Sequence, residues 1–139
     1  LYLKALDHLN PTHEYGVAFE RGVRITLADA YQYFISGTAS INNKGEVVHV
    51  GDIVRQTERM WENVSALLTE AGSGFQDIAQ IIVYLRDIGD YQTVRTMFDQ
   101  KFPETPYVIT LAPVCRPTWL IEMECVAIRP DGNPAFRDF

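Results

Sequence analysis

Residues 119–128 read WLIEMECVAI, an almost unbroken apolar run that carries two carboxylates. Alternate side chains of a β-strand point to opposite faces of its sheet. One face of this strand comprises the apolar residues Trp119, Ile121, Met123, Cys125 and Ala127. The other face comprises Leu120, Glu122, Glu124, Val126 and Ile128. The first face is predicted to pack on helices, whereas the second is too apolar to face water alone across a whole sheet.

Two amphipathic helices are predicted to cover the first face. Asp52 is a good N-cap for the first helix, in which apolar residues recur at helical spacing from Ile53 up to Gly72. Asp90 can cap a second helix, whose apolar stripe is stopped by Pro103. Two helices of this kind can cover one face of a sheet.

Strand-like segments surround these helices in the sequence. Strands are predicted within 16–41, 78–87, 106–114 and 119–128, and residues 42–47 (NNKGEV) have hairpin chemistry. The order of elements is then β-β-β-α-β-α-β-β. This order predicts an α+β fold with two helices on one face of the sheet.

The second face of the sheet needs a cover of its own. In the strand at 78–86, alternation places Ile78 with Ile82 and Tyr84. The opposite face is also apolar and comprises Ala79, Ile81, Val83 and Leu85. Because both helices are used on the first face, another subunit is the economical cover for the second. We therefore predict a homo-oligomer, with Glu122 and Glu124 near the subunit contact.

Length, charge and cysteine content narrow the class of protein. The chain has 139 residues, 47% of them hydrophobic, which suits one globular domain. A net charge of −6 and the lack of any Lys/Arg run argue against a nucleic-acid partner. No apolar run reaches the length of a membrane span, and no signal peptide is predicted. Cys115 and Cys125 are expected to be reduced, so we predict a cytoplasmic protein. A start without Met suggests a processed chain or one domain of a longer protein.

Three motifs make the chain resemble the YjgF/Rid superfamily, the reactive intermediate (imine) deaminases. They lie at 33–48 (YFISGTASINNKGEVV), within 56–102 and at 119–130 (WLIEMECVAIRP). The resemblance covers residues 15–130, which leaves 1–14 as a leader or junction and 131–139 as a C-terminal tail. It implies a chorismate-mutase-like α+β fold with a mixed sheet. It also implies a homotrimer with an inner barrel and three ligand pockets at the subunit clefts.

The resemblance also implies site residues, position by position. Ser36-Gly37 matches a pocket-lining pair at the end of an early strand, and Tyr15 matches a pocket-lining tyrosine. Glu122 matches a glutamate that positions a water. In the deaminating branch, an arginine in the penultimate strand grips the substrate carboxylate. The matching residue here is Val108, so the defining arginine is absent.

A second resemblance concerns residues 114–125 (VCRPTWLIEMEC), which are similar to the last strand of the chorismatases. In that group a glutamate on this strand is the catalytic acid. The identity of the residue seven positions earlier distinguishes the reaction subtypes of the group. Here these positions hold Glu122 and Cys115. Residues 9–22 resemble the junction between the two chorismatase halves. This chain would match only the second half.

Each candidate residue also has a simpler interpretation. Desolvation on an apolar face would raise the pKa of Glu122 and favour a proton donor; otherwise Glu122 is a solvated or arginine-paired carboxylate. Arg95 and Arg116 suit a carboxylate clamp, because a guanidinium binds a carboxylate with two hydrogen bonds, but either could form a surface ion pair. Cys115 is interpreted as a pocket wall rather than a nucleophile. Tyr107 could line the cleft or pack in the core.

Two classes of function follow from these residues. The first is an acid-assisted hydrolase of chorismatase-like or deaminase-like type, acting on a small carboxylate metabolite. The second is a non-catalytic, ligand-binding or regulatory trimer. No cofactor is expected, and no metal either, because the three histidines lack metal-ligand spacing with a Cys or Asp.

Overall fold

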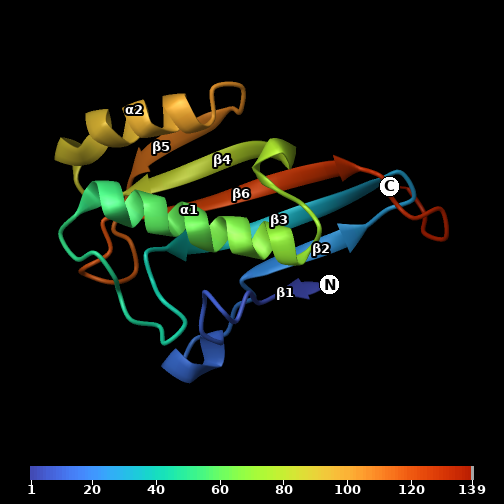
Figure 1. The fold of residues 1–139 in the computed structure, drawn as a ribbon, viewed down its shortest axis with the longest axis horizontal. Coiled ribbons are helices and arrows are strands. Elements are labelled where there is room, and N and C mark those ends of the chain that lie inside the picture. Colours follow the sequence, from blue (N-terminus) through green and yellow to red (C-terminus); the bar gives the residue numbers. More distant parts are fainter. Residues whose placement is uncertain (139) are drawn as a thin grey trace.

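The computed structural model describes residues 1–138, except for the side chain of Tyr15. Its six strands form one mixed sheet in the order β1-β2-β3-β6-β4-β5 (Figure 1). Only β4 and β5 pair in parallel; the other neighbours are antiparallel. The strands are β1 (Tyr2–Leu3), β2 (Gly22–Thr26), β3 (Ala30–Ala39), β4 (Ile78–Leu85), β5 (Tyr107–Leu111) and β6 (Ile121–Pro130). The helices are α1 (Ile53–Glu70) and α2 (Tyr91–Lys101), with short 3-10 turns at Thr12–Tyr15, Phe75–Asp77 and Ile88–Asp90.

The core lies between the sheet and the two helices, which cover the same face (Figure 1). The predicted inward face of β6 is confirmed, since its residues and Trp119 are at most 7% exposed. Met60, Val64 and Leu67 of α1 are fully buried against this sheet. The predicted α+β arrangement is therefore correct.

Helix α1 begins where the sequence predicts. The carboxylate of Asp52 accepts the backbone N–H of Arg55 at 3.0 Å, which satisfies one of the free amides of the first turn. Asp90 precedes α2 as predicted, but its side chain makes no capping hydrogen bond.

We expect Asp52→Ala to lower the free energy of unfolding by about 1 kcal/mol, because the Arg55 amide loses its acceptor. Asp90→Ala is the matched control and should cost clearly less, since no capping bond is lost. Urea denaturation of both variants measures the difference. Equal losses would show that the Asp52 cap contributes little.

The first strand of the sheet lies earlier in the chain than predicted. Residues 16–21 form no strand, because Gly16 adopts a left-handed conformation that ends a 3-10 turn. Instead β1 pairs with β2, and Leu3 and Leu9 are fully buried. The leader segment thus contributes to the core of the domain.

A register shift in β4 reverses part of the predicted alternation. The pairing of β4 with β6 is irregular between Ile78 and Gln80. Ile78 therefore lies in the core with Ile81, although the prediction grouped it with Ile82 and Tyr84, and Ala79 is exposed although it was grouped with Ile81. Beyond the irregularity, Ile82 and Tyr84 share one face as predicted, and this is the face away from the helices.

The start of the C-terminal tail is attached to the β2–β3 turn. The Asn133 amide donates to the Leu27 carbonyl at 2.7 Å. A Cβ at Gly132 would lie 2.4 Å from the backbone of the same turn, so this close approach requires glycine.

The face of the sheet opposite the helices is open within residues 1–138. Pairing across it aligns Ile128 with Gln32 and Ile25, and Val126 with Phe34. Phe34 is 42% exposed and Ile128 44%, so this apolar surface is uncovered in the single chain.

Candidate functional site

Glu122 lies near the start of β6, between β3 and β4. It pairs with Ala39 on one side and with Tyr84 on the other. Its side chain is on the open face, yet the residue is only 9% exposed. The loop 112–120 between β5 and β6 closes over this end of the strand.

Two backbone segments approach the Glu122 carboxyl group. The amide of Cys115 donates to Oε2 at 3.3 Å. On the other side, a Cβ at Gly37 would lie 3.3 Å from Oε1, so a side chain there would press on the carboxyl group. Gly37 lies in the irregular stretch of β3 between Ile35 and Thr38. The structure thus brings together three residues that the sequence analysis selected, Gly37, Cys115 and Glu122.

The surroundings raise the pKa of Glu122 above its ordinary value. Burial is the main cause, because it disfavours the ionised form. The hydrogen bond from Cys115 and the positive charge of Arg86 act in the opposite direction. The balance favours a carboxyl group that keeps its proton at a higher pH than an exposed glutamate, as a general acid requires.

This shift predicts a pH-dependent stability difference between the wild type and Glu122→Gln. Just above the ordinary glutamate pKa, the folded protein still holds a proton that the unfolded chain has released. The wild type therefore loses stability as pH rises through this window, whereas glutamine does not titrate. We expect the stability of Glu122→Gln relative to the wild type to increase from about pH 4 to about pH 7. Denaturation of both proteins at both pH values measures this difference in the free energy of unfolding. If the stability of Glu122→Gln relative to the wild type fell as the pH rises, the raised pKa would be contradicted.

Arg86 is a residue of this region that the sequence analysis missed. It follows β4 and is half-buried. Its guanidinium donates to three carbonyl oxygens of the loop 112–120, at 2.6 to 2.8 Å. The sequence feature that could have identified Arg86 is its position at the end of a buried strand, because a buried cation needs polar partners.

Arg116 lies on the same loop. Its Nη1 donates to the Gly45 carbonyl at 3.0 Å, and its guanidinium lies 5.3 Å from the centre of the Trp119 ring. Arg116 therefore joins the loop 112–120 to the turn at 42–47.

Ser36 borders a neighbouring hollow on the open face. This hollow has a volume of about 230 Å³ and is lined by Phe34, Ile35, Ser36, Gln80, Ile82, Glu124, Cys125 and Val126. The Ser36 hydroxyl donates to the Glu20 carbonyl at 2.7 Å. Burial and a hydrogen bond with Glu124 raise the pKa of Tyr84, which is the β4 neighbour of Glu122.

Arg95 and Tyr107 belong to a separate cluster at the α2–β5 edge. Arg95 is exposed, its Nη1 donates to the Tyr91 hydroxyl at 2.9 Å, and its Nε lies 3.7 Å from Asp99. The Tyr107 hydroxyl donates to Asp99, and the Tyr107 ring lies 5.4 Å from that of Phe98 on the helix side. Burial and Asp99 raise the pKa of Tyr107 to about 12. No described contact joins this cluster to Glu122 within one chain.

The remaining predicted positions have simple placements. Val108 is 53% exposed on the open face, next to Ile82 of β4. Cys115 is exposed and Cys125 buried, and neither is in a disulfide. Burial raises the pKa of Cys125 to about 12, which makes this thiol unreactive. The side chain of Tyr15 lies outside the described part of the chain.

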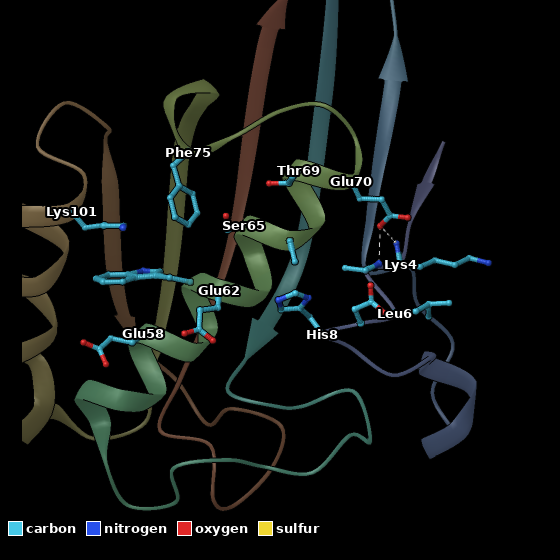
Figure 2. Close-up of a pocket in the computed structure, with 14 residues that line it drawn as sticks. Lys4, Leu6, His8, Glu58, Glu62, Ser65, Thr69, Glu70, Phe75 and Lys101 are labelled. Atoms are coloured by element: carbon cyan, nitrogen blue, oxygen red, sulfur yellow. Dashed lines mark hydrogen bonds between the residues drawn. The ribbon is translucent and has the colours of Figure 1, made fainter.

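A larger groove runs over the outer surface of α1, with a volume of about 1050 Å³. Lys101 and Phe75 border it on one side of the helix, and Lys4 and His8 on the other (Figure 2). It contains none of the predicted site residues. We place the site at Glu122 because a buried carboxyl group with a raised pKa lies there, whereas the groove is wide and open.

The fold is an α+β domain, and its candidate site is a buried carboxyl group on the last strand of the sheet. The family model for Endoribonuclease L-PSP matches residues 18–129. The chain therefore belongs to the Endoribonuclease L-PSP family, which is the YjgF/Rid superfamily.

Two relatives illustrate the similarity in sequence. A RutC family protein from Pyrococcus abyssi is 35% identical over 99 residues, which are 69% of this chain and 77% of that protein. The 3-aminoacrylate deaminase RutC from Acinetobacter baylyi is 33% identical over 108 residues, which are 76% of this chain and 84% of that protein.

Solved structures share the fold at lower identity. The yeast protein Mmf1 has a TM-score of 0.79 at 15% identity, covering 93% of this chain and 98% of that one. The YjgF gene product of E. coli has a TM-score of 0.75 at 23% identity, again covering 93% and 98%. E. coli TdcF, solved with bound serine, has a TM-score of 0.75 at 21% identity and the same coverage.

Within residues 1–138, no helix has the length and apolar character needed to cross a bilayer. The same residues contain no group of three or more His, Cys, Asp or Glu side chains arranged to hold a metal ion.

Proposed function

We propose that this protein is a hydrolase of the YjgF/Rid superfamily that acts on a small carboxylate metabolite, with Glu122 as the proton donor. The observation that carries the proposal is the buried Glu122 carboxyl group, whose pKa is raised mainly by desolvation. The sequence similarity of this chain to a 3-aminoacrylate deaminase also supports hydrolytic chemistry.

The proposed substrate is an acrylate that carries an amino group or an ether oxygen on its double bond. Neutral Glu122 donates its proton to the carbon of the double bond that lacks the heteroatom. The heteroatom stabilises the resulting cation, and water adds to the carbon that bears it. The carbon–nitrogen or carbon–oxygen bond then breaks and leaves a carbonyl group. One proton of the water passes to the departing nitrogen or oxygen, which leaves as ammonia or an alcohol, and the other restores Glu122.

The substrate carboxylate needs a cationic partner, and Val108 cannot provide one. Arg116 is the candidate from the same chain, because it lies on the loop that contacts Glu122. Arg95 is the candidate from a neighbouring subunit, since it is exposed and lies apart from Glu122 within one chain. Ser36, Gly37, Tyr15, Cys115 and Tyr107 are proposed to line the pocket.

We further propose a homotrimer with its ligand pockets at the subunit clefts. The open apolar face of the sheet supports this assembly, because in water it would stay exposed. A cytoplasmic location, a Rid domain at 15–130 and the similarity to the second half of a chorismatase also belong to the proposal.

A non-catalytic ligand-binding trimer is the second candidate, and Val108 favours it, because the arginine that defines the deaminases is missing. The ribonuclease activity in the family's name is disfavoured by the net charge of −6.

A thermal-shift panel tests whether the protein binds small carboxylates. We expect chorismate, 3-hydroxybenzoate or 2-oxobutyrate to raise the melting temperature, and benzoate, which lacks any heteroatom substituent, to act as the control. A ligand at about 100 times its Kd stabilises the folded state by about 2.7 kcal/mol, a shift of several degrees. A flat response to the whole panel at millimolar concentrations would contradict the proposal.

A further inference from the structure

The loop 112–120 has no regular secondary structure, yet it must hold one amide against Glu122. The Cys115 N–H reaches Oε2 only because the loop folds back over the start of β6. Backbone bonds attach the loop only at its ends, where Ala112 donates to Leu85 and Arg86 donates to Leu120. The middle of the loop therefore depends on side chains for its position.

Arg86 supplies three of these side-chain bonds, and Gln56 of α1 supplies two, at Thr118 and Leu120 near the β6 end of the loop. The Nε of Arg86 donates to the Trp119 carbonyl at 2.7 Å, and its Nη2 donates to Val114 at 2.8 Å and to Arg116 at 2.6 Å. These acceptors lie on both sides of Cys115 in the sequence. A guanidinium can hold them together because its donors are fixed in one plane, whereas an ammonium group is a compact point charge on a flexible stem.

We infer that Arg86 is a positioning residue, which holds the loop 112–120 so that the Cys115 amide stays bonded to Glu122. The inference rests on the proposed role of Glu122 as proton donor. Arg86 acts through the loop and need not touch the substrate. Its positive charge also lowers the pKa of Glu122, against the effect of burial.

The effect of Arg86 on Glu122 can be separated from the effects of the other groups around Glu122. Tyr84 faces it from β4, Glu124 follows on its own strand, and Cys115 approaches from the loop. On the β3 side lies Gly37, which has no side chain. The positive charge of Arg86 favours ionisation of Glu122, and Arg86→Lys keeps this charge, so that variant tests the position of the loop rather than the charge.

Amide hydrogen exchange and NMR titration of Arg86→Lys test the inference without any substrate. We expect the Cys115 amide to exchange at least about 10-fold faster than in the wild type, since its loop opens more often. We also expect the Cys115 amide shift to follow the Glu122 titration in the wild type and to lose this response in Arg86→Lys. Glu122→Gln identifies the response, because it removes the titrating group.

Arg59→Lys is the matched control. Arg59 also donates to two carbonyl oxygens, those of Ile41 and His8, but neither lies in the loop 112–120. It should leave the exchange and titration of Cys115 unchanged. Exchange within twofold of the wild type and an intact titration response in Arg86→Lys would overturn the inference.

A measurement on the wild type alone covers the case in which Arg86→Lys does not fold. The side-chain Nε–H of Arg86 and the Cys115 amide should exchange with similar protection, because one opening event exposes both. Protection that differs by more than about 100-fold would overturn the inference. Because none of these readouts uses substrate, an absence of turnover would refute the proposed function and leave the role of Arg86 standing.

Discussion

Glu122→Gln is expected to reduce kcat/KM for hydrolysis by about 10²–10⁴-fold, the usual contribution of a positioned general acid. Glutamine keeps the shape of the side chain and can still accept the Cys115 amide, but it has no proton to donate. The substrate should therefore still bind, and the loss should appear in kcat. Steady-state kinetics on a substrate that the wild type turns over measures both constants.

Glu70→Gln is the matched control for this experiment. Glu70 also accepts backbone amides, those of Lys4 and Ala5 at 2.9 and 2.7 Å, but it lies at the end of α1 away from the site. It should keep the wild-type kcat. If Glu122→Gln retained more than about a tenth of the wild-type kcat, Glu122 would not be the proton donor.

Phe34→Glu is expected to convert the proposed trimer into a monomer. Phe34 lies in the middle of the open face, paired with Val126 and Val23. If that face is covered by other subunits, each trimer would bury three unpaired carboxylates, at a cost of several kcal/mol each. Light scattering coupled to size-exclusion chromatography measures the mass directly.

Ile88→Glu provides the comparison on another surface. Ile88 is 66% exposed, more than Phe34, but it lies in the 3-10 turn before α2. It should leave the mass unchanged. A Phe34→Glu protein with the same mass as the wild type would show that the open face is not the subunit contact.

The strand that carries the site was predictable because its two faces differ in chemistry. Met123 and Cys125 alternate with Glu122 and Glu124, and the first pair is buried as predicted. The capping role of Asp52 was also predictable, because it follows from local backbone chemistry. Patterns of this kind depend on neighbours in the sequence.

The errors occurred where contacts distant in sequence decide the local structure. A two-residue strand such as β1 has no periodicity, and its pairing with β2 is visible only in the fold. The irregularity at Ile78 comes from pairing with β6, and it reverses the faces of Ile78 and Ala79.

The arrangement of the candidate site was predicted only in part, for the same reason. Glu122, Cys115 and Gly37 were selected and do lie together. Arg86 was missed, because its partners lie 28 to 33 residues later in the chain. Arg95 was also selected, but it lies in the α2–β5 cluster, where its polar partners are residues of its own helix.

The most direct test of the central proposal is turnover by the purified wild-type protein. Ammonia release from 3-aminoacrylate and pyruvate release from chorismate can be followed side by side, with Glu122→Gln as the blank. Catalytic release of either product that depends on Glu122 is the predicted result. Saturable binding of these acids with no product above the Glu122→Gln blank would contradict the hydrolase and support the non-catalytic trimer.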